Sequence, residues 1–174
     1  MLVRCGILPE AGISLRQSAL QRWSWLGLLL LVADQVLKYS IMTTFVLGES
    51  VLVWPIFDLT RVHNSGAAFS FLADASGWQR WLFTVISTGV SLVLGVWLRR
   101  LPRQQWLLGL ALILVLAGAM GNLVDRLLYG YVVDFISLHY QQYYFPAFNL
   151  ADSAICCGAF VLLLDAWQHS SSNR

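Results

Sequence analysis

Charged side chains are scarce in this sequence, and that scarcity decides its broad class. Charged residues make up 11% of the 174 residues, whereas soluble domains carry about 25%. Hydrophobic residues make up 58% of the chain, and the mean hydropathy is +0.67. These values exclude an ordinary soluble domain. They predict a polytopic membrane protein with a single domain, residues 1–174.

Cysteine is also rare, and the three that occur are Cys5, Cys156 and Cys157. Three cysteines provide no disulfide framework. Cys156 and Cys157 lie in an apolar stretch, so we expect them to pack within a membrane helix. Apolar surroundings disfavour a thiolate, which argues against a cysteine nucleophile. An A-x-A-like cleavage motif is missing after the first apolar stretch, which therefore reads as a retained signal anchor.

Four stretches are long and apolar enough to cross a bilayer, whose core requires about 20 residues per helix. They are residues 23–42, 81–98, 106–124 and 148–167. Arginines concentrate before the first stretch, at Arg4 and Arg16 in the tail 1–20 and at Arg22, and in the tight RRLPRQ loop between the second and third stretches. Because positive charge favours the cytoplasmic side, we predict that both termini are cytoplasmic. Segments 43–80 and 125–147 are then on the outer side.

The first outer segment contains more than a linker. Residues 51–62, VLVWPIFDLTRV, are rich in β-branched and aromatic residues and predict short strands. The Asn64-Ser65-Gly66 sequence that follows predicts a turn. The uncharged residues 67–71 are expected to lie against the membrane interface. The predicted fold is thus an all-α bundle of four transmembrane helices with a small extracytoplasmic β-cradle.

Polar side chains of the spans gather at one depth, near the outer face. They are Asp34 and Lys38 on the first span, Asn122, Asp125 and Arg126 at the end of the third, Asp134 in the next connection, and Asn149 and Asp152 at the start of the fourth. Spacings of three and four residues place the members of each helical group on one face. Asp165 lies apart, near the cytoplasmic end, and is interpreted as structural. Polar groups with only a packing role would not be expected to converge in this way.

Asp134 and Asp152 are the most informative of these residues, because each is a carboxylate in an apolar context. An ionisable residue at membrane depth is a functional hypothesis by default. Two carboxylates that meet share one proton, so one can activate water while the other protonates the substrate. This is the chemistry of an aspartic hydrolase, and it requires no metal, no other cofactor and no covalent intermediate.

Five sequence blocks, in order over roughly residues 25 to 165, resemble those of the bacterial lipoprotein signal peptidases (signal peptidase II), which are intramembrane aspartic proteases. The blocks are Asp34-Gln35-x-x-Lys38, Asn64-Ser65-Gly66-Ala67-Ala68-Phe69-Ser70, Gly121-Asn122-x-x-Asp125-Arg126, Val133-Asp134-Phe135 and Phe148-Asn149-x-Ala151-Asp152. One block alone is weak, but five in this order are a specific signal.

The resemblance implies a substrate, a cleavage site and a set of roles. The substrate is a prolipoprotein whose cysteine carries a diacylglyceryl group, and cleavage falls just before that cysteine. By motif, Asp134 and Asp152 are the catalytic dyad, Asn64, Asn122, Arg126 and Asn149 bind substrate or position the dyad, and Asp34, Lys38 and Asp125 support them. The expected setting is the bacterial inner membrane, with the site near the periplasmic face. The expected partners are prolipoproteins and membrane lipid, without nucleic acid, for a monomeric protein.

Several alternatives use the same residues differently. Asp134 and Asp152 could be ion-paired with Arg126 and Lys38 purely for packing. A Ser/His/Asp triad would use the outer residues Ser65, His63 and His139, but no motif places them together. A metal site would use the two histidines with the aspartate dyad, but the ligand spacing is missing. A proton-coupled transporter would use the aspartates as a relay, although the second span and the inner halves of the first and third carry no charge. A non-enzymatic scaffold has no use for converging carboxylates.

Overall fold

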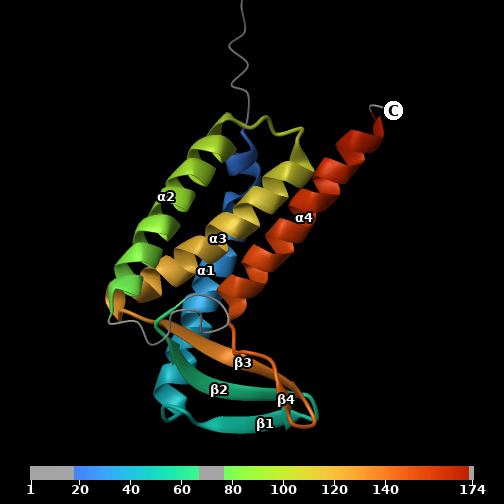
Figure 1. Cartoon of the computed structure of the whole chain (residues 1–174). Coiled ribbons are helices and arrows are strands. Elements are labelled where there is room, and N and C mark those ends of the chain that lie inside the picture. Colours follow the sequence, from blue (N-terminus) through green and yellow to red (C-terminus); the bar gives the residue numbers. More distant parts are fainter. Residues whose placement is uncertain (1–17, 67–76, 173–174) are drawn as a thin grey trace, which may run out of the picture.

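The computed structural model describes residues 18–66 and 77–172, so the expectation for residues 67–71 lies outside the described chain. Its elements are α1 (Ala19–Thr44), β1 (Ser50–Trp54), β2 (Phe57–Asn64), α2 (Trp78–Arg100), α3 (Trp106–Leu128), β3 (Val132–Tyr140), β4 (Tyr143–Tyr144) and α4 (Leu150–Ser172). The four helices form a bundle with the sheet at one end, and the C-terminus lies at the opposite end (Figure 1). Four helices able to span a membrane and a small antiparallel sheet confirm this part of the predicted fold.

The first helix begins earlier than the sequence suggested. Ser18 and Gln21 form a reciprocal capping box, and the N–H of Ala19 donates to the carbonyl of Leu101 across the bundle. Such a cap satisfies two otherwise unpaired donors at the helix start. Residues 18–20, expected to belong to the tail, are therefore part of the folded bundle.

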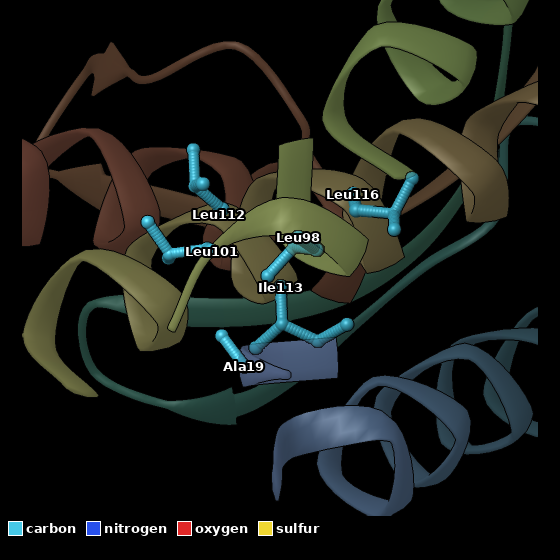
Figure 2. Close-up of a cluster of buried hydrophobic side chains, with 6 residues drawn as sticks. All are labelled: Ala19, Leu98, Leu101, Leu112, Ile113 and Leu116. Atoms are coloured by element: carbon cyan, nitrogen blue, oxygen red, sulfur yellow. The ribbon is translucent and has the colours of Figure 1, made fainter. Parts of the chain in front are cut away.

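The third helix is the centre of the bundle. In its most apolar window 56% of the residues are buried inside the protein, against 17% to 22% for the other three helices. The helices α1, α2 and α4 thus expose long apolar surfaces, as helices in lipid do. Away from the sheet, a hydrophobic cluster joins the start of α1, the end of α2 and the first half of α3 (Figure 2). Its buried members are Ala19, Leu98, Leu101, Leu112, Ile113 and Leu116.

The sheet is antiparallel in the order β1-β2-β3-β4. The strands β1 and β2 cover the segment 51–62 predicted to form strands and extend slightly beyond it at both ends. The longer strand β3 was expected only as a connection. It pairs with β2 so that Asp134 lies opposite Val62. Val133 and Phe135 on this strand pack with Ile41 near the end of α1 in a second hydrophobic cluster. This packing fixes the β3 backbone, and with it Asp134, against the end of the bundle that carries the sheet.

Candidate active site

Asp134 lies on β3 with only 2% of its surface exposed. Both of its carboxylate oxygens accept a hydrogen bond from an asparagine side chain. Asn64, at the end of β2, donates to Oδ2 at 2.9 Å, and Asn149 donates to Oδ1 at 2.7 Å. A buried carboxylate is thus provided with donors on both sides, as a polar group without water requires.

Asp152 lies in the first turn of α4, where the helix start holds it. Asn149 precedes the helix, and its Oδ1 accepts the Asp152 N–H at 2.9 Å, while the Asp152 carboxylate accepts the Asn149 N–H at 3.3 Å. This is the reciprocal arrangement of a capping box. The positive end of the helix dipole also stabilises a negative charge at this position. A second donor to this carboxylate, Nδ2 of Asn122, lies 2.7 Å from Oδ1 of Asp152.

Two asparagines connect the two carboxylates. Nδ2 of Asn149 lies 3.2 Å from Oδ1 of Asn122, in addition to its bond to Asp134. Asn122 in turn donates to Asp152. The two aspartates, 18 positions apart in sequence on a strand and a helix, thus belong to one hydrogen-bond network. The structure brings together Asn64, Asn122, Asp134, Asn149 and Asp152, as the sequence predicted for a site.

Arg126 borders the same region without pairing with the aspartates as the packing alternative supposed. Its guanidinium donates to the carbonyls of Asn122 and Gly66, each at 3.2 Å, and lies over the ring of Phe83. Lys38 pairs instead with Asp34 at 2.8 Å and with Asp125 at 2.9 Å. The cations that the alternative assigned to the dyad are therefore engaged elsewhere.

The supporting residues form a buried group directly beneath the site. Asp34 accepts the N–H of Ala151 in the first turn of α4 at 2.9 Å, and Asp125 accepts the N–H of Val133 on β3 at 3.1 Å. Each carboxylate thus contacts the backbone next to one candidate catalytic aspartate. Asp125, near the end of α3, is fully buried.

Gln35 is a member of this group that sequence reasoning left without a role. Its side-chain amide donates to Asp34 at 3.2 Å, to Asp125 at 3.0 Å and to the carbonyl of Gly121 at 3.2 Å. Gln35 stands directly after Asp34 in the first sequence block, and this position was the sequence signal that could have identified it. Its contacts join α1 to α3 at the depth of the site.

A cavity of about 350 Å³ opens beside the network. Its polar wall consists of Asn64, Asn122, Arg126 and Asp152. Its apolar wall includes Phe145 to Phe148 and continues along α4 past Ser153, Cys156 and Cys157. Both cysteines are exposed, so the expectation that they pack within the bundle is wrong. Their small side chains instead leave room along the helix, and the cavity combines a carboxylate with an apolar groove.

Burial raises the pKa of Asp134 from its ordinary value of 3.8 to about 7, and the nearby charge of Asp152 adds to the rise. Hydrogen bonds from Asn64 and Asn149 oppose it, because they stabilise the ionised form. Near neutral pH this carboxyl can therefore carry a proton. Asp152, by contrast, lies on the cavity wall and at a helix start.

The histidines of the triad and metal alternatives lie on the sheet. His63 stacks on Tyr131 with ring centroids 3.8 Å apart, and His139 lies 3.3 Å from Asp58 and stacks on Tyr144. Within residues 18–66 and 77–172, histidine, cysteine and acidic side chains form no group of three or more suited to a metal ion. The hydrogen-bond network therefore contains the aspartates and asparagines, whereas the two histidines make their contacts within the sheet.

Comparisons with known proteins identify the family of this chain. Residues 26–168 match the family described as Signal peptidase (SPase) II. The lipoprotein signal peptidases of Shewanella halifaxensis (strain HAW-EB4) and Shewanella pealeana (strain ATCC 700345 / ANG-SQ1) are 54% and 53% identical over 146 residues, which is 84% of this chain and 86% of each relative.

Two solved structures of bacterial membrane enzymes share the fold. One has a TM-score of 0.81 at 30% identity and covers 91% of this chain and 95% of its own, and the other has 0.73 at 32% identity and covers 86% and 96%. The sequence resemblance is therefore confirmed. The chain belongs to the signal peptidase II family of lipoprotein signal peptidases, multi-pass membrane hydrolases of the aspartic peptidase class.

Proposed function

We propose that this protein removes the signal peptide from diacylglyceryl-modified prolipoproteins by hydrolysis at an aspartate dyad, Asp134 and Asp152. The observation that carries the proposal is the network in which three asparagine amides donate to these two carboxylates beside an open cavity. The peptide bond cut is the one just before the lipidated cysteine. All the groups named come from one chain, so a monomer suffices.

The two aspartates take different parts in the reaction. Asp152 lines the cavity and lies at the positive end of α4, so it is the ionised general base. It accepts a proton from water as the water oxygen attacks the carbonyl carbon of the scissile bond. Asp134, buried and with a raised pKa, is the general acid. It donates its proton to the carbonyl oxygen, which gives a neutral tetrahedral intermediate. As the C–N bond breaks, Asp152 passes the proton taken from water to the leaving nitrogen, and a hydroxyl group of the intermediate returns a proton to Asp134 as the carbonyl reforms.

The polar wall positions the substrate for this step. Asn64 and Arg126 lie on the cavity wall, where amide and guanidinium donors can reach the carbonyl groups of a substrate backbone. Asn122 and Asn149 hold the carboxylates at fixed positions, so little reorganisation is required when charge develops. The nine residues assigned from the sequence thus divide into a dyad, a positioning shell and a buried support.

The apolar part of the cavity suits the lipid on the substrate. Small side chains at Ser153, Cys156 and Cys157 extend the groove along α4, away from the carboxylates. Acyl chains can lie there while the scissile bond reaches Asp152. This route joins the lipid phase to the polar site, which is what a membrane-bound lipoprotein precursor requires.

The orientation in the inner membrane follows from charge. Arg99, Arg100 and Arg103 lie at the α2–α3 connection, at the end of the bundle opposite the sheet (Figure 1). The positive-inside rule puts that end in the cytoplasm. The sheet and the dyad then lie at the periplasmic face, where water is available.

A direct test uses purified protein and two matched prolipoprotein peptides, one with a diacylglyceryl group on its cysteine and one without. Mass spectrometry of the products identifies the bond that is cut. We expect cleavage of the lipidated peptide alone, just before the modified cysteine. Cleavage at another bond, or equal cleavage of the unmodified peptide, would contradict the proposed substrate.

A further inference from the structure

Lys38 is the only lysine in the chain, and it is almost completely buried at 1% exposure. Its ammonium nitrogen lies 2.8 Å from Asp34, 2.9 Å from Asp125 and 3.1 Å from Oδ1 of Asn122. An ammonium group has three N–H donors and no acceptor. Three partners therefore use its full capacity, which offsets the cost of burying the charge.

The third contact determines which way the Asn122 amide faces. An asparagine side chain carries an oxygen that accepts and a nitrogen that donates, and the two can exchange places by rotation. Since Lys38 can only donate, the atom of Asn122 that faces it must be the oxygen. The nitrogen then points at Asp152, where it donates at 2.7 Å.

The other two asparagines of the network are oriented by the backbone. The oxygen of Asn149 accepts the N–H of Asp152 at 2.9 Å, and the oxygen of Asn64 accepts the N–H of Gly66 at 3.0 Å. In both, an obligate donor holds the oxygen, so the nitrogen faces Asp134. Among these three amides, Asn122 is the one whose orientation depends on a charged side chain.

We infer that Lys38 is a positioning residue for catalysis, acting through Asn122 to keep a hydrogen-bond donor on Asp152. Nδ2 of Asn149 also donates to the Asn122 oxygen, at 3.2 Å, but this is a hydrogen bond between neutral groups. Without Lys38 the charged donor on that oxygen is lost, so the Asn122 amide can more readily turn its oxygen toward the Asp152 carboxylate. Two acceptors would then face each other, and the base would lose its shortest donor. This inference rests on the proposed function, because it assigns the ionised role to Asp152.

A double-mutant cycle tests the coupling. The variants are Lys38→Met, Asn122→Ala and the double substitution, with Ser40→Ala as the matched control. Ser40 is exposed on the same helix and donates only to the carbonyl of Val36. Turnover of the lipidated peptide gives kcat and KM, and the melting temperature in detergent verifies folding. Where Lys38→Met does not fold, Lys38→Gln completes the cycle under the same criteria.

We expect Lys38→Met to lower kcat roughly 10- to 100-fold, as loss of a charge-assisted hydrogen bond would, with KM within about 2-fold of wild type. The kcat of the double variant should lie no more than about 3-fold below that of the less active single variant, since both substitutions disrupt the same interaction with Asp152. Costs that multiply, or a change in KM alone, would overturn the inference. If the folded wild type and the Ser40→Ala variant both fail to cleave the lipidated peptide, this result would contradict the proposed function instead.

Discussion

Asp134 and Asp152 are chemically identical side chains in different surroundings. Asp134 is buried on a strand between two asparagines, whereas Asp152 begins a helix beside a cavity. Burial and the neighbouring charge raise the pKa of Asp134 to about 7, so its proton is retained near neutral pH. In the proposed mechanism the difference in surroundings, rather than in residue type, separates the general acid from the general base.

This asymmetry predicts a shift in the pH dependence of the Asn64→Ala variant. In the proposed mechanism activity requires protonated Asp134, so kcat should fall as pH rises through about 7. The hydrogen bond from Asn64 stabilises the ionised form and opposes the rise in pKa. Its removal should raise the pKa further and move the alkaline limb of the kcat profile to higher pH. A limb that stays in place or moves to lower pH would contradict the acid role of Asp134.

At the level of single residues, the sequence predicted which side chains meet but not how they bond. Asn122, Asp134 and Asp152 were identified as lone polar residues in apolar stretches. Burial of a polar group in a membrane is costly, so such a residue indicates a function. The direction of each hydrogen bond depends on partners from distant segments. The N–H of Gly66 and the ammonium of Lys38, for example, orient amides that sequence spacing leaves free.

The helices α3 and α4 pack closely because glycines face the start of α4. A methyl group at Gly118 would overlap the carbonyl oxygen of Ala151 and lie 2.7 Å from Ile155. A methyl group at Gly121 would lie 3.1 Å from Cβ of Ala151 on α4, and 2.7 Å from the carboxylate of Asp34 on α1. These contacts set the distance between Asn122 on α3 and Asp152 on α4. The dyad geometry thus depends on the absence of side chains at two positions.

Substitution Gly118→Ala should therefore lower both stability and turnover. Overpacking of this kind costs about 1–3 kcal/mol in free energy of unfolding. Displacement of α4 should also separate Asp152 from Asn122 and reduce kcat. The matched control is Gly89→Ala on α2, where a methyl group would meet nothing within 4 Å. Thermal melting and peptide cleavage compare the two, and a Gly118→Ala variant as stable and active as Gly89→Ala would contradict this packing.

Element prediction succeeded where the pattern was local. Long apolar stretches identified the four helices, and the β-branched run at residues 51–62 predicted strands. The strand β3 was not predicted, because its identity depends on pairing with β2 far away in sequence. The start of α1 at Ala19 was also missed, since its cap depends on contacts with the α2–α3 connection.

The whole molecule is polarised along its long axis. Arginines cluster at the α2–α3 connection, whereas the sheet and the carboxylate network occupy the other end (Figure 1). The expected orientation, with the sheet in the periplasm, rests on this charge distribution. Labelling of single introduced cysteines tests this orientation, in a protein whose three native cysteines are replaced by serine.

Ser50→Cys on β1 should react with a membrane-impermeant maleimide in intact spheroplasts. Gln104→Cys, in the α2–α3 connection, should react only after the membrane is permeabilised. Both positions are exposed, so access to the reagent depends on the side of the membrane rather than on burial. The reverse labelling pattern would place the site in the cytoplasm and contradict the orientation.

The central claim, hydrolysis by the Asp134–Asp152 dyad, is tested most directly by gel-shift cleavage of a diacylglyceryl-modified prolipoprotein. The comparison is between wild type, Asp134→Asn and Asp152→Asn, all purified and shown by thermal melting to be folded. The account predicts cleavage by the wild type and loss of cleavage to background in both variants, because each carboxyl group performs a proton transfer that an amide cannot. Turnover close to the wild-type level in either folded variant would contradict the dyad.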